Sequence, residues 1–365
     1  MAVASSVHDE GKRLRAPKVL KVGSDFTGLD APRVALSRML GPDKVTHLFS
    51  SDQAIECQAV LKGREPHGVV YGDVLARTAD QEEYVDLYTW SPPCQSYSFA
   101  GKRGGITDSR GKLLSQGIRY ISRKKPRCAI LENVKGLASG PFKWILKGVV
   151  KSLKAMSYAP YCKVLNAKNY GVPQSRERLF VVAIRKDSLC RKFKWPTPLQ
   201  ETLTVTDILE PFNPKVDKIC RLPKRKRPSA LAASAFKKAF ENGVDPRSVP
   251  VLVDVDCSPR YATSGINIAK TLTRTRGGQG GPWISTRGRR TSTLELMRLQ
   301  GFSPGDVNNF DSADKSVKIT KTQKGQMLGN SIPVPLMGHV MAEAMWAAGL
   351  VASMPDTSNL SRFLD

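Results

Sequence analysis

The sequence predicts an α/β fold, in which a mostly parallel sheet with helices on both faces is joined to a small, mostly irregular or β domain. From about residue 19 to residue 184, short β-rich runs alternate with helical patterns, which is typical of βαβ units. Near residue 190 the prolines multiply, basic residues cluster and the regular periodicity fades. A helical pattern returns at residue 293.

Each expected element has a local signal. Strands are expected at residues 19–22, 45–49, 69–71, 85–90, 128–131 and 179–184. A helix is expected over residues 32–40, because Val34, Leu36 and Met39 fall on one side and Pro32 suits a first turn. Further helices are expected at residues 147–156 and 337–348.

These changes in pattern divide the chain into five parts. We expect an N-terminal tail (1–17), the first part of a large domain (18–188), a small domain (189–288), the second part of the large domain (289–350) and a C-terminal tail (351–365).

The composition favours a polyanionic partner. Lys and Arg number 57 against 32 Asp and Glu, a net charge of +25, and basic groups gain affinity for phosphates by releasing condensed counterions. The surplus is concentrated between residues 185 and 290, which carry 22 basic and 9 acidic residues. At 41% apolar the chain can bury a core, yet no run approaches the roughly 20 apolar residues of a membrane span.

The seven cysteines are odd in number and include no CxxC pair, so we expect free thiols in a reducing, intracellular compartment and no metal site. The N-terminus lacks the apolar region of a secretory signal. The basic run at residues 224–227 is open to three interpretations: a nuclear localisation signal, a phosphate contact or a solvated surface. A eukaryotic host would favour the nucleus and any other host the cytoplasm.

The most informative stretch is residues 91–101, where Cys94 stands directly behind two prolines. It follows the strand expected at 85–90, so Cys94 should lie on a loop stiffened by fixed φ angles. A segment rich in Gly, Lys and Arg follows at residues 100–110 and can contact phosphate. A presented thiol beside a basic loop indicates covalent chemistry on a nucleic acid.

Acidic residues follow three successive strands. The first βα turn contains Gly28, and a glycine turn between strand and helix is the usual place for a nucleotide-like cofactor. Asp52 follows the next strand, where it can accept from both ribose hydroxyls, and Asp73 closes the third, where it can meet an adenine edge. Taken singly, each acid could equally be a loop residue or a helix cap.

A further acid, Glu132, ends the strand expected at 128–131, so it could converge with Cys94 at the same sheet edge. A thiolate adds to carbon 6 of cytosine only if ring nitrogen 3 receives a proton or strong hydrogen bond, which a glutamic acid with a raised pKa can supply. Taken alone, Glu132 could equally be a structural carboxylate. Alternation places Gln174, Arg176 and Arg178 on one face at the entrance of the next strand.

These residues, in this order, resemble the DNA (cytosine-5) methyltransferase family, which uses S-adenosylmethionine (SAM). The resemblance covers roughly residues 19–184 and 289–350. Its most specific element is Pro93-Cys94-Gln95, followed by Ser98, Ala100-Gly101, Gly105, Asp108, Arg110-Gly111 and Leu113. Further matches are Glu132-Asn133-Val134, the Gln-x-Arg-x-Arg run from residue 174, Glu295-x-x-Arg298-Leu299-Gln300-Gly301-Phe302 and Gln326-x-x-Gly329-Asn330-Ser331.

The resemblance implies a Rossmann-like methyltransferase sheet and a function, the transfer of a methyl group from SAM to carbon 5 of cytosine in DNA. Cys94 would form a covalent adduct with a flipped-out base, and Glu132 would act on ring nitrogen 3. Arg178 would contact the target base, while Arg176 would hold Glu132 and backbone phosphate. The SAM site would comprise Phe26, Gly28, Leu29, Asp52, Asp73, Pro93, Asn330 and Ser331.

The implied partner is double-stranded DNA, bound by a monomer and read by a target-recognition domain at residues 189–288. Thr271-Leu272 resembles a dipeptide that this domain tends to share, and residues 273–281 are suited to groove contact through an exposed backbone and two arginines. The DNA contacts would come from Gln95, Ser98, Arg110, Thr271, Arg274 and Arg276.

Departures from the family pattern leave two alternatives. Asp30-Ala31 stands where the family usually has two glycines, Ser24 occupies a commonly acidic place, and Asp52 replaces a glutamate. Asp30 could repel the SAM carboxylate or meet its ammonium group. One alternative is a tRNA cytosine-5 methyltransferase of the same family; the other is a catalytically silent DNA-binding relative with a lost cofactor site.

Overall fold

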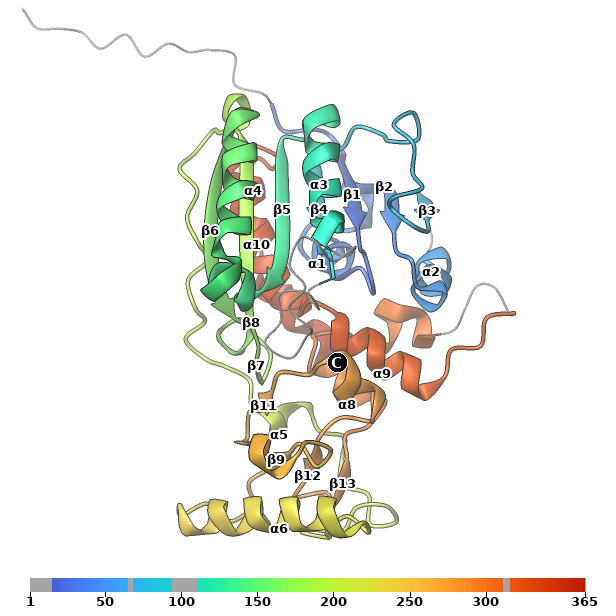
Figure 1. The fold of residues 1–365 in the computed structure, drawn as a ribbon, viewed down its shortest axis with the longest axis vertical. Coiled ribbons are helices and arrows are strands. Elements are labelled where there is room, and N and C mark those ends of the chain that lie inside the picture. Colours follow the sequence, from blue (N-terminus) through green and yellow to red (C-terminus); the bar gives the residue numbers. More distant parts are fainter. Residues whose placement is uncertain (1–14, 65–67, 94–110, 311–315, 365) are drawn as a thin grey trace, which may run out of the picture.

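The computed structural model describes residues 15–64, 68–93, 111–310 and 316–364, which form a large α/β part and a smaller part (Figure 1). Within these residues the large part is built on a seven-stranded sheet of order β3-β2-β1-β4-β5-β8-β6. Its strands are β1 (Leu20–Asp25), β2 (Val45–Ser51), β3 (Val69–Tyr71), β4 (Leu87–Trp90), β5 (Cys128–Val134), β6 (Tyr158–Asn166) and β8 (Glu177–Arg185).

The sheet is parallel from β3 to β5, as expected, whereas β8 runs antiparallel to both β5 and β6. The sequence did not predict β6. This strand lies at the sheet edge, exposes Cys162 and Lys163 and contains Pro160, so its pattern is neither alternating nor continuously apolar. An edge strand tolerates such residues because one side of its backbone needs no partner strand.

Helices cover both faces of the sheet, which confirms the predicted layers (Figure 1). Buried residues of α1 (Ala31–Leu40), α2 (Ile55–Lys62) and α10 (Val334–Ala347) share one apolar cluster with one face of the sheet. Those of α3 (Gly111–Lys124) and α4 (Lys143–Ala155) share a second cluster with the other face. Clusters on both sides explain why the central strands are apolar throughout.

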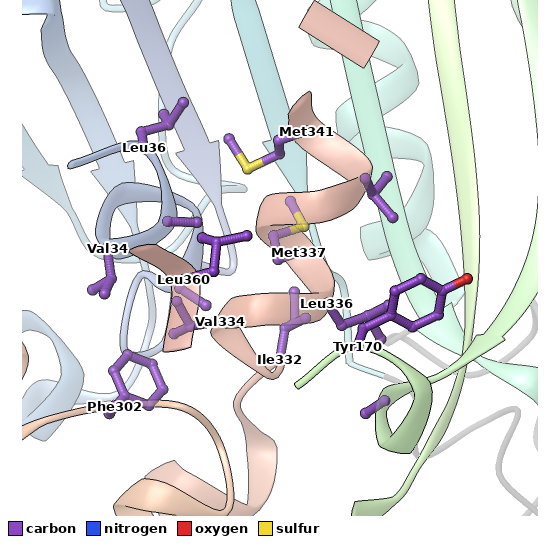
Figure 2. Packing of buried hydrophobic residues seen from close by; sticks show 14 of the residues in the cluster. Val34, Leu36, Tyr170, Phe302, Ile332, Val334, Leu336, Met337, Met341 and Leu360 are labelled. Atoms are coloured by element: carbon purple, nitrogen blue, oxygen red, sulfur yellow. The ribbon is translucent and has the colours of Figure 1, made fainter. Parts of the chain in front are cut away.

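Helix α10 is the centre of the first cluster. It is buried on nearly all sides, and its Met337 and Met341 belong to the cluster that α10 shares with α1 and the sheet (Figure 2). Within the segment expected as a C-terminal tail, the 3-10 helix η9 (Ser358–Leu364) contacts α1 and α10. Leu360 and Phe363 are fully buried in the same cluster, and Arg38 of α1 donates to the carbonyl oxygen of Leu360 at 3.0 Å.

The smaller part contains more regular structure than its sequence predicted. A four-stranded sheet of order β10-β9-β12-β13 packs against the 16-residue helix α6 (Lys226–Glu241). The basic run at 224–227 therefore leads into the first turn of α6, whose apolar residues, Leu231, Ala232, Phe236 and Ala239, follow helical spacing. The strands are β9 (Val251–Val253), β10 (Ser264–Ile266), β12 (Trp283–Ile284) and β13 (Arg289–Arg290).

Short elements join the two parts. A two-stranded parallel sheet pairs β7 (Gln174–Ser175) with β11 (Ala269–Lys270). The remaining α-helices among the described residues are α5 (Val205–Ile208), α7 (Arg274–Gly278), α8 (Thr293–Arg298) and α9 (Lys321–Asn330). All six cysteines in the described ranges are free thiols, and no described helix has the length and apolar character needed to cross a membrane.

Burial of His339 in α10 generates a prediction on acid stability. Its ring lies 5.8 Å from that of Tyr170, and burial lowers the pKa of His339 to about 4. A pKa lowered from the unfolded value of about 6.5 means that His339 adds stability above pH 6.5, which is lost as the pH falls toward 4. The contribution is roughly 3 kcal/mol. We expect the free energy of unfolding of His339→Leu to fall less between pH 6.5 and pH 4 than that of the wild type, measured by urea denaturation at each pH. An equal fall in both proteins would contradict this.

Candidate active site at the carboxyl edge of the sheet

The parallel strands end at one edge of the sheet, and this edge gathers most of the residues expected to form the site. The turn at residues 26–30 follows β1, Asp52 follows β2, Asp73 follows β3 and the segment 91–93 follows β4. Glu132 lies within β5, near its carboxyl end. Cys94, Gln95, Ser98 and Arg110 lie outside the described residues.

The turn after β1 is fixed by hydrogen bonds to the next strand. The Thr27 amide donates to the Ser51 carbonyl at 2.9 Å, and the Gly28 amide donates to the Asp52 carboxylate at 2.8 Å. The other Asp52 oxygen accepts from the Ala54 amide at 2.9 Å. Burial raises the pKa of Asp52, and these two backbone hydrogen bonds oppose the shift. Asp52 thus organises the turn in addition to any contact with a ligand.

The turn adopts left-handed backbone conformations at Phe26, Gly28 and Asp30, with φ of 57°, 56° and 52°. Glycine takes this conformation most readily, and aspartate is one of the few other residues that adopt it, so Asp30 can stand at a position that would also suit glycine. Its side chain compensates by capping α1, accepting from the Arg33 amide at 3.3 Å. A Cβ added at Gly28 would meet no atom within 4 Å, so the turn is open on that side.

The Asp30 carboxylate points into the protein rather than into the open space above the turn. Asp30 is 1% exposed, and the buried Arg64 nearby donates to the Leu29 carbonyl at 2.9 Å. Burial lowers the pKa of Arg64 to about 10, and the charge of Asp30 opposes that shift. The Leu29 side chain, expected at the cofactor site, lies in the first apolar cluster instead, because the helix it precedes needs an apolar contact with the core.

Asp73 and Pro93 lie on either side of this turn along the sheet edge. Asp73 is exposed, and one of its oxygens accepts from the Leu75 amide at 2.9 Å. The Asn133 side chain donates to the Pro92 carbonyl at 3.2 Å, which fixes Pro92 against β5. Asn330, exposed, ends α9, and Ser331 follows it with 7% exposure.

Glu132 forms a nearly buried ion pair with Arg178, and the atoms that meet, Oε1 and Nε, are 2.9 Å apart. In the β5–β8 register Glu132 is opposite Phe180 and Arg178 is opposite Val134, so the two side chains are diagonal neighbours on one face. Burial raises the pKa of Glu132, while the charges of Arg178 and Arg176 oppose the rise. The carboxyl therefore holds a proton to higher pH than an exposed glutamate.

The resemblance assigned the contact with Glu132 to Arg176, and the structure gives it to Arg178. Arg176 is 2% exposed and donates to three backbone carbonyls, those of Leu272 (2.5 Å), Gly329 (3.1 Å) and Ser331 (2.7 Å). Arg176 lies between β7 and β8, and its side chain contacts the end of the smaller part at Leu272 and the end of α9 at Gly329 and Ser331; we call this set of contacts the joint.

Gln174 takes part in the same joint, a role that its sequence motif did not reveal. Fully buried, it donates to the Leu299 carbonyl at 2.8 Å and accepts from the Leu272 amide at 2.8 Å. The Thr271 hydroxyl donates to the Ser175 carbonyl at 2.8 Å. Thr271, expected at the DNA, thus also anchors β11 to β7.

Residues 273–281 are not an exposed glycine loop. They begin with α7, which packs so closely on α9 that a Cβ on Gly277 would lie 1.9 Å from the Gly325 carbonyl oxygen. Arg276 is held by Asp254, with Nε and Oδ2 2.7 Å apart, whereas the Arg274 side chain is exposed at the first position of α7. Of the two arginines, Arg274 is therefore the better placed to meet a ligand.

A buried charge network at the end of β1 also escaped prediction. Arg77 forms a two-bond ion pair with Asp25, at 2.7 and 2.8 Å, and both side chains are almost fully buried. The Tyr88 hydroxyl donates to the same carboxylate at 2.6 Å, and the guanidinium lies 4.7 Å from the centre of the Phe49 ring. This network ties the loop after β3 to β1. No group of His, Cys, Asp and Glu in the described ranges could hold a metal ion.

The chain is similar to known proteins over most of its length. A family model described as C-5 cytosine-specific DNA methylase matches residues 20–346. The type II methyltransferase M1.ScrFI of Lactococcus lactis subsp. cremoris is 28% identical over 330 residues, 88% of this chain and 76% of the relative. M.NlaX of Neisseria lactamica is 28% identical over 340 residues, 90% of this chain and 97% of the relative. The solved structure of the Entamoeba histolytica methyltransferase EhMeth shares the fold, with a TM-score of 0.61 at 17% identity, covering 90% and 98% of the two chains.

The close contact between α7 and α9 can be tested with two glycine substitutions. Gly277→Ala places a methyl group against a backbone carbonyl that cannot move freely, so we expect a loss of about 1–3 kcal/mol in the free energy of unfolding. Gly148→Ala is the control: it lies in α4, a Cβ there meets nothing within 4 Å, and helix propensity predicts a gain of about 0.5–1 kcal/mol. Urea denaturation of both variants measures the difference, and a neutral Gly277→Ala would contradict the packing.

Proposed function

Because the chain belongs to the C-5 cytosine-specific DNA methylase family and is therefore a DNA (cytosine-5-)-methyltransferase, we propose that its active site is the carboxyl edge of the main sheet, with SAM as the methyl donor. The observation that carries the proposal is the nearly buried Glu132–Arg178 pair, which lies next to Asn133, the residue that holds Pro92, two positions before Cys94 in the sequence. A carboxyl with a raised pKa is the group that protonation of cytosine nitrogen 3 requires.

The residues present fit SAM. The turn after β1 is open above Gly28, Asp52 and Asp73 offer carboxylate oxygens beside it, and Asp30 is turned away. SAM supplies an electrophilic methyl group when bound. The residues proposed to hold it are Phe26, Gly28, the backbone of Leu29, Asp52, Asp73, Pro93, Asn330 and Ser331.

The chemistry follows from the roles proposed for three side chains. The Cys94 thiolate adds to carbon 6 of a cytosine that has been flipped out of its helix. Glu132 gives a proton or a strong hydrogen bond to ring nitrogen 3, which makes carbon 5 nucleophilic. Arg178 orients Glu132 and reaches the base beside it. After methyl transfer, loss of the carbon 5 proton lets the ring expel the Cys94 sulfur as a thiolate, and nitrogen 3 returns its proton to Glu132, which restores the neutral aromatic ring.

The proposed partner is double-stranded DNA bound by a monomer. The net charge of +25 favours phosphate, and Arg274 is exposed next to the strand that Gln174 and Ser175 hold. The smaller part, with its α6-covered sheet, is proposed to be the target-recognition domain.

Transfer of labelled methyl from SAM tests this function directly. We expect label in unmethylated duplex DNA and its loss in Cys94→Ser, because the hydroxyl of serine is a far weaker nucleophile than a thiolate. Transfer to tRNA is measured in parallel. Label in tRNA alone would contradict the DNA substrate, and a Cys94→Ser variant that kept full activity would contradict the covalent route.

A second test uses the pH dependence that Glu132 imposes. Its raised pKa keeps the acid form available above the ordinary range, so the rate should fall as the pH rises through the pKa of Glu132. Glu132→Gln removes the proton donor, and we expect a loss of about 10²–10⁴-fold in kcat together with disappearance of that alkaline limb.

The control for this test is Glu177→Gln. Glu177 lies on β8 beside Arg178, but its ion pair with Lys135 is about half exposed, so both the rate and the pH profile should remain those of the wild type. If the rate of Glu132→Gln still fell with rising pH as it does in the wild type, the titrating group would be another residue and not Glu132.

A further inference from the structure

A single buried guanidinium joins the segment that leads to the DNA with the segment that leads to the cofactor. Arg176 donates to the carbonyl of Leu272, which lies between Thr271 and the exposed Arg274, and also to the carbonyls of Gly329 and Ser331, on either side of Asn330. We propose that Arg176, assisted by Gln174, couples the binding of DNA to the binding of SAM. This inference rests on the proposed function for the assignment of the two segments to their ligands.

Leu272 is held from both sides, which makes the joint specific. Its amide donates to Gln174 and its carbonyl accepts from Arg176, so two side chains of one short segment take both polar groups of one residue. Gln174 and Arg176 are 0% and 2% exposed. Water therefore cannot replace a broken bond, and a segment that shifts leaves a buried polar group without a partner.

The two segments are also in direct contact with each other. A Cβ on Gly329 would lie 2.3 Å from the Thr273 carbonyl oxygen, and one on Gly325 would lie 2.0 Å from that of Gly277. Contacts this close do not allow α7 to slide over α9 without separating from it. A movement of α7 that follows DNA binding is therefore passed to the end of α9, where Asn330 and Ser331 begin the proposed cofactor contact.

The short segment from Arg176 to Arg178 also connects the joint to Glu132, the proposed catalytic acid. Arg178 follows Arg176 by two residues and forms the ion pair with Glu132, while the charge of Arg176 itself acts on that carboxyl. Arg176 is thus a positioning residue whose effect is seen first in the linkage of two bound ligands. Linkage requires that each ligand change the affinity for the other by the same factor.

The experiment measures the affinity of the full chain for S-adenosylhomocysteine by calorimetry, with and without a saturating amount of unmethylated plasmid DNA at fixed salt. We expect DNA to tighten binding about tenfold in the wild type. In Arg176→Met the factor should fall to about one, while the affinity without DNA stays within about threefold, because the joint and not the cofactor contact is lost.

The matched control is Arg185→Met. Arg185 ends the same strand, β8, and also donates to a backbone carbonyl, that of Lys125, but it lies at the far end from Glu132. Its coupling factor should equal that of the wild type. Equal factors in Arg176→Met and the wild type, or no coupling in the wild type, would overturn the inference.

A ligand-free measurement separates this inference from the proposed function. Hydrogen exchange of residues 269–281 and 325–332 should rise in both segments together in Arg176→Met and in neither segment in Arg185→Met; a rise in only one would overturn the joint. Gln174→Met, which keeps the guanidinium and loses two hydrogen bonds, gives the same test with a partial loss if Arg176→Met does not fold. If the wild type failed to bind S-adenosylhomocysteine, the proposed cofactor would be wrong. The hydrogen-exchange result would then still show whether Arg176 holds the two segments together.

Discussion

The hydrogen bonds of the buried Arg176 guanidinium hold together the parts of the chain from which the site is assembled. Its partners are 96, 153 and 155 residues away in the sequence, so the first part of the large domain, the end of the smaller part and the C-terminal part meet at one side chain. A guanidinium suits this position because it offers several donors in a rigid plane and keeps its charge when buried. A guanidinium has no hydrogen-bond acceptor, so the Leu272 amide needs another partner. The side-chain oxygen of Gln174 accepts from it.

The edge of the sheet organises the rest of the site around this joint. Parallel strands bring the β1 turn, Asp52, Asp73 and Glu132 to one side, and hydrogen bonds between neighbouring loops hold them there. The C-terminal part completes the edge because α10 is apolar on nearly every side and is stable only when buried between the sheet and α1 (Figure 2). The return of η9 onto α1 and α10 closes the same cluster.

Charge is buried in two different ways near the turn after β1. Asp25 and Arg77 neutralise each other in direct contact, with the Tyr88 hydroxyl as a further donor. Asp30 accepts a helix-capping hydrogen bond and lies near the buried Arg64, whose charge offsets its own. The family glycine can therefore be replaced here, since the aspartate fits the left-handed conformation and turns its charge inward.

By itself, the sequence determined the α/β class, most strands of the main sheet and the edge on which Glu132, Asp52 and Asp73 lie, because strand composition and strand ends are local signals. Only the tertiary structure decided that Arg178 and not Arg176 meets Glu132, since that depends on the register between β5 and β8. It also decided that the glycines after Thr273 pack against α9, and that residues beyond 350 return to the core. The edge strand β6 and the helix α6 were also visible only in the tertiary structure. A proline masks the local pattern of β6, a basic composition masks that of α6, and long-range packing stabilises both.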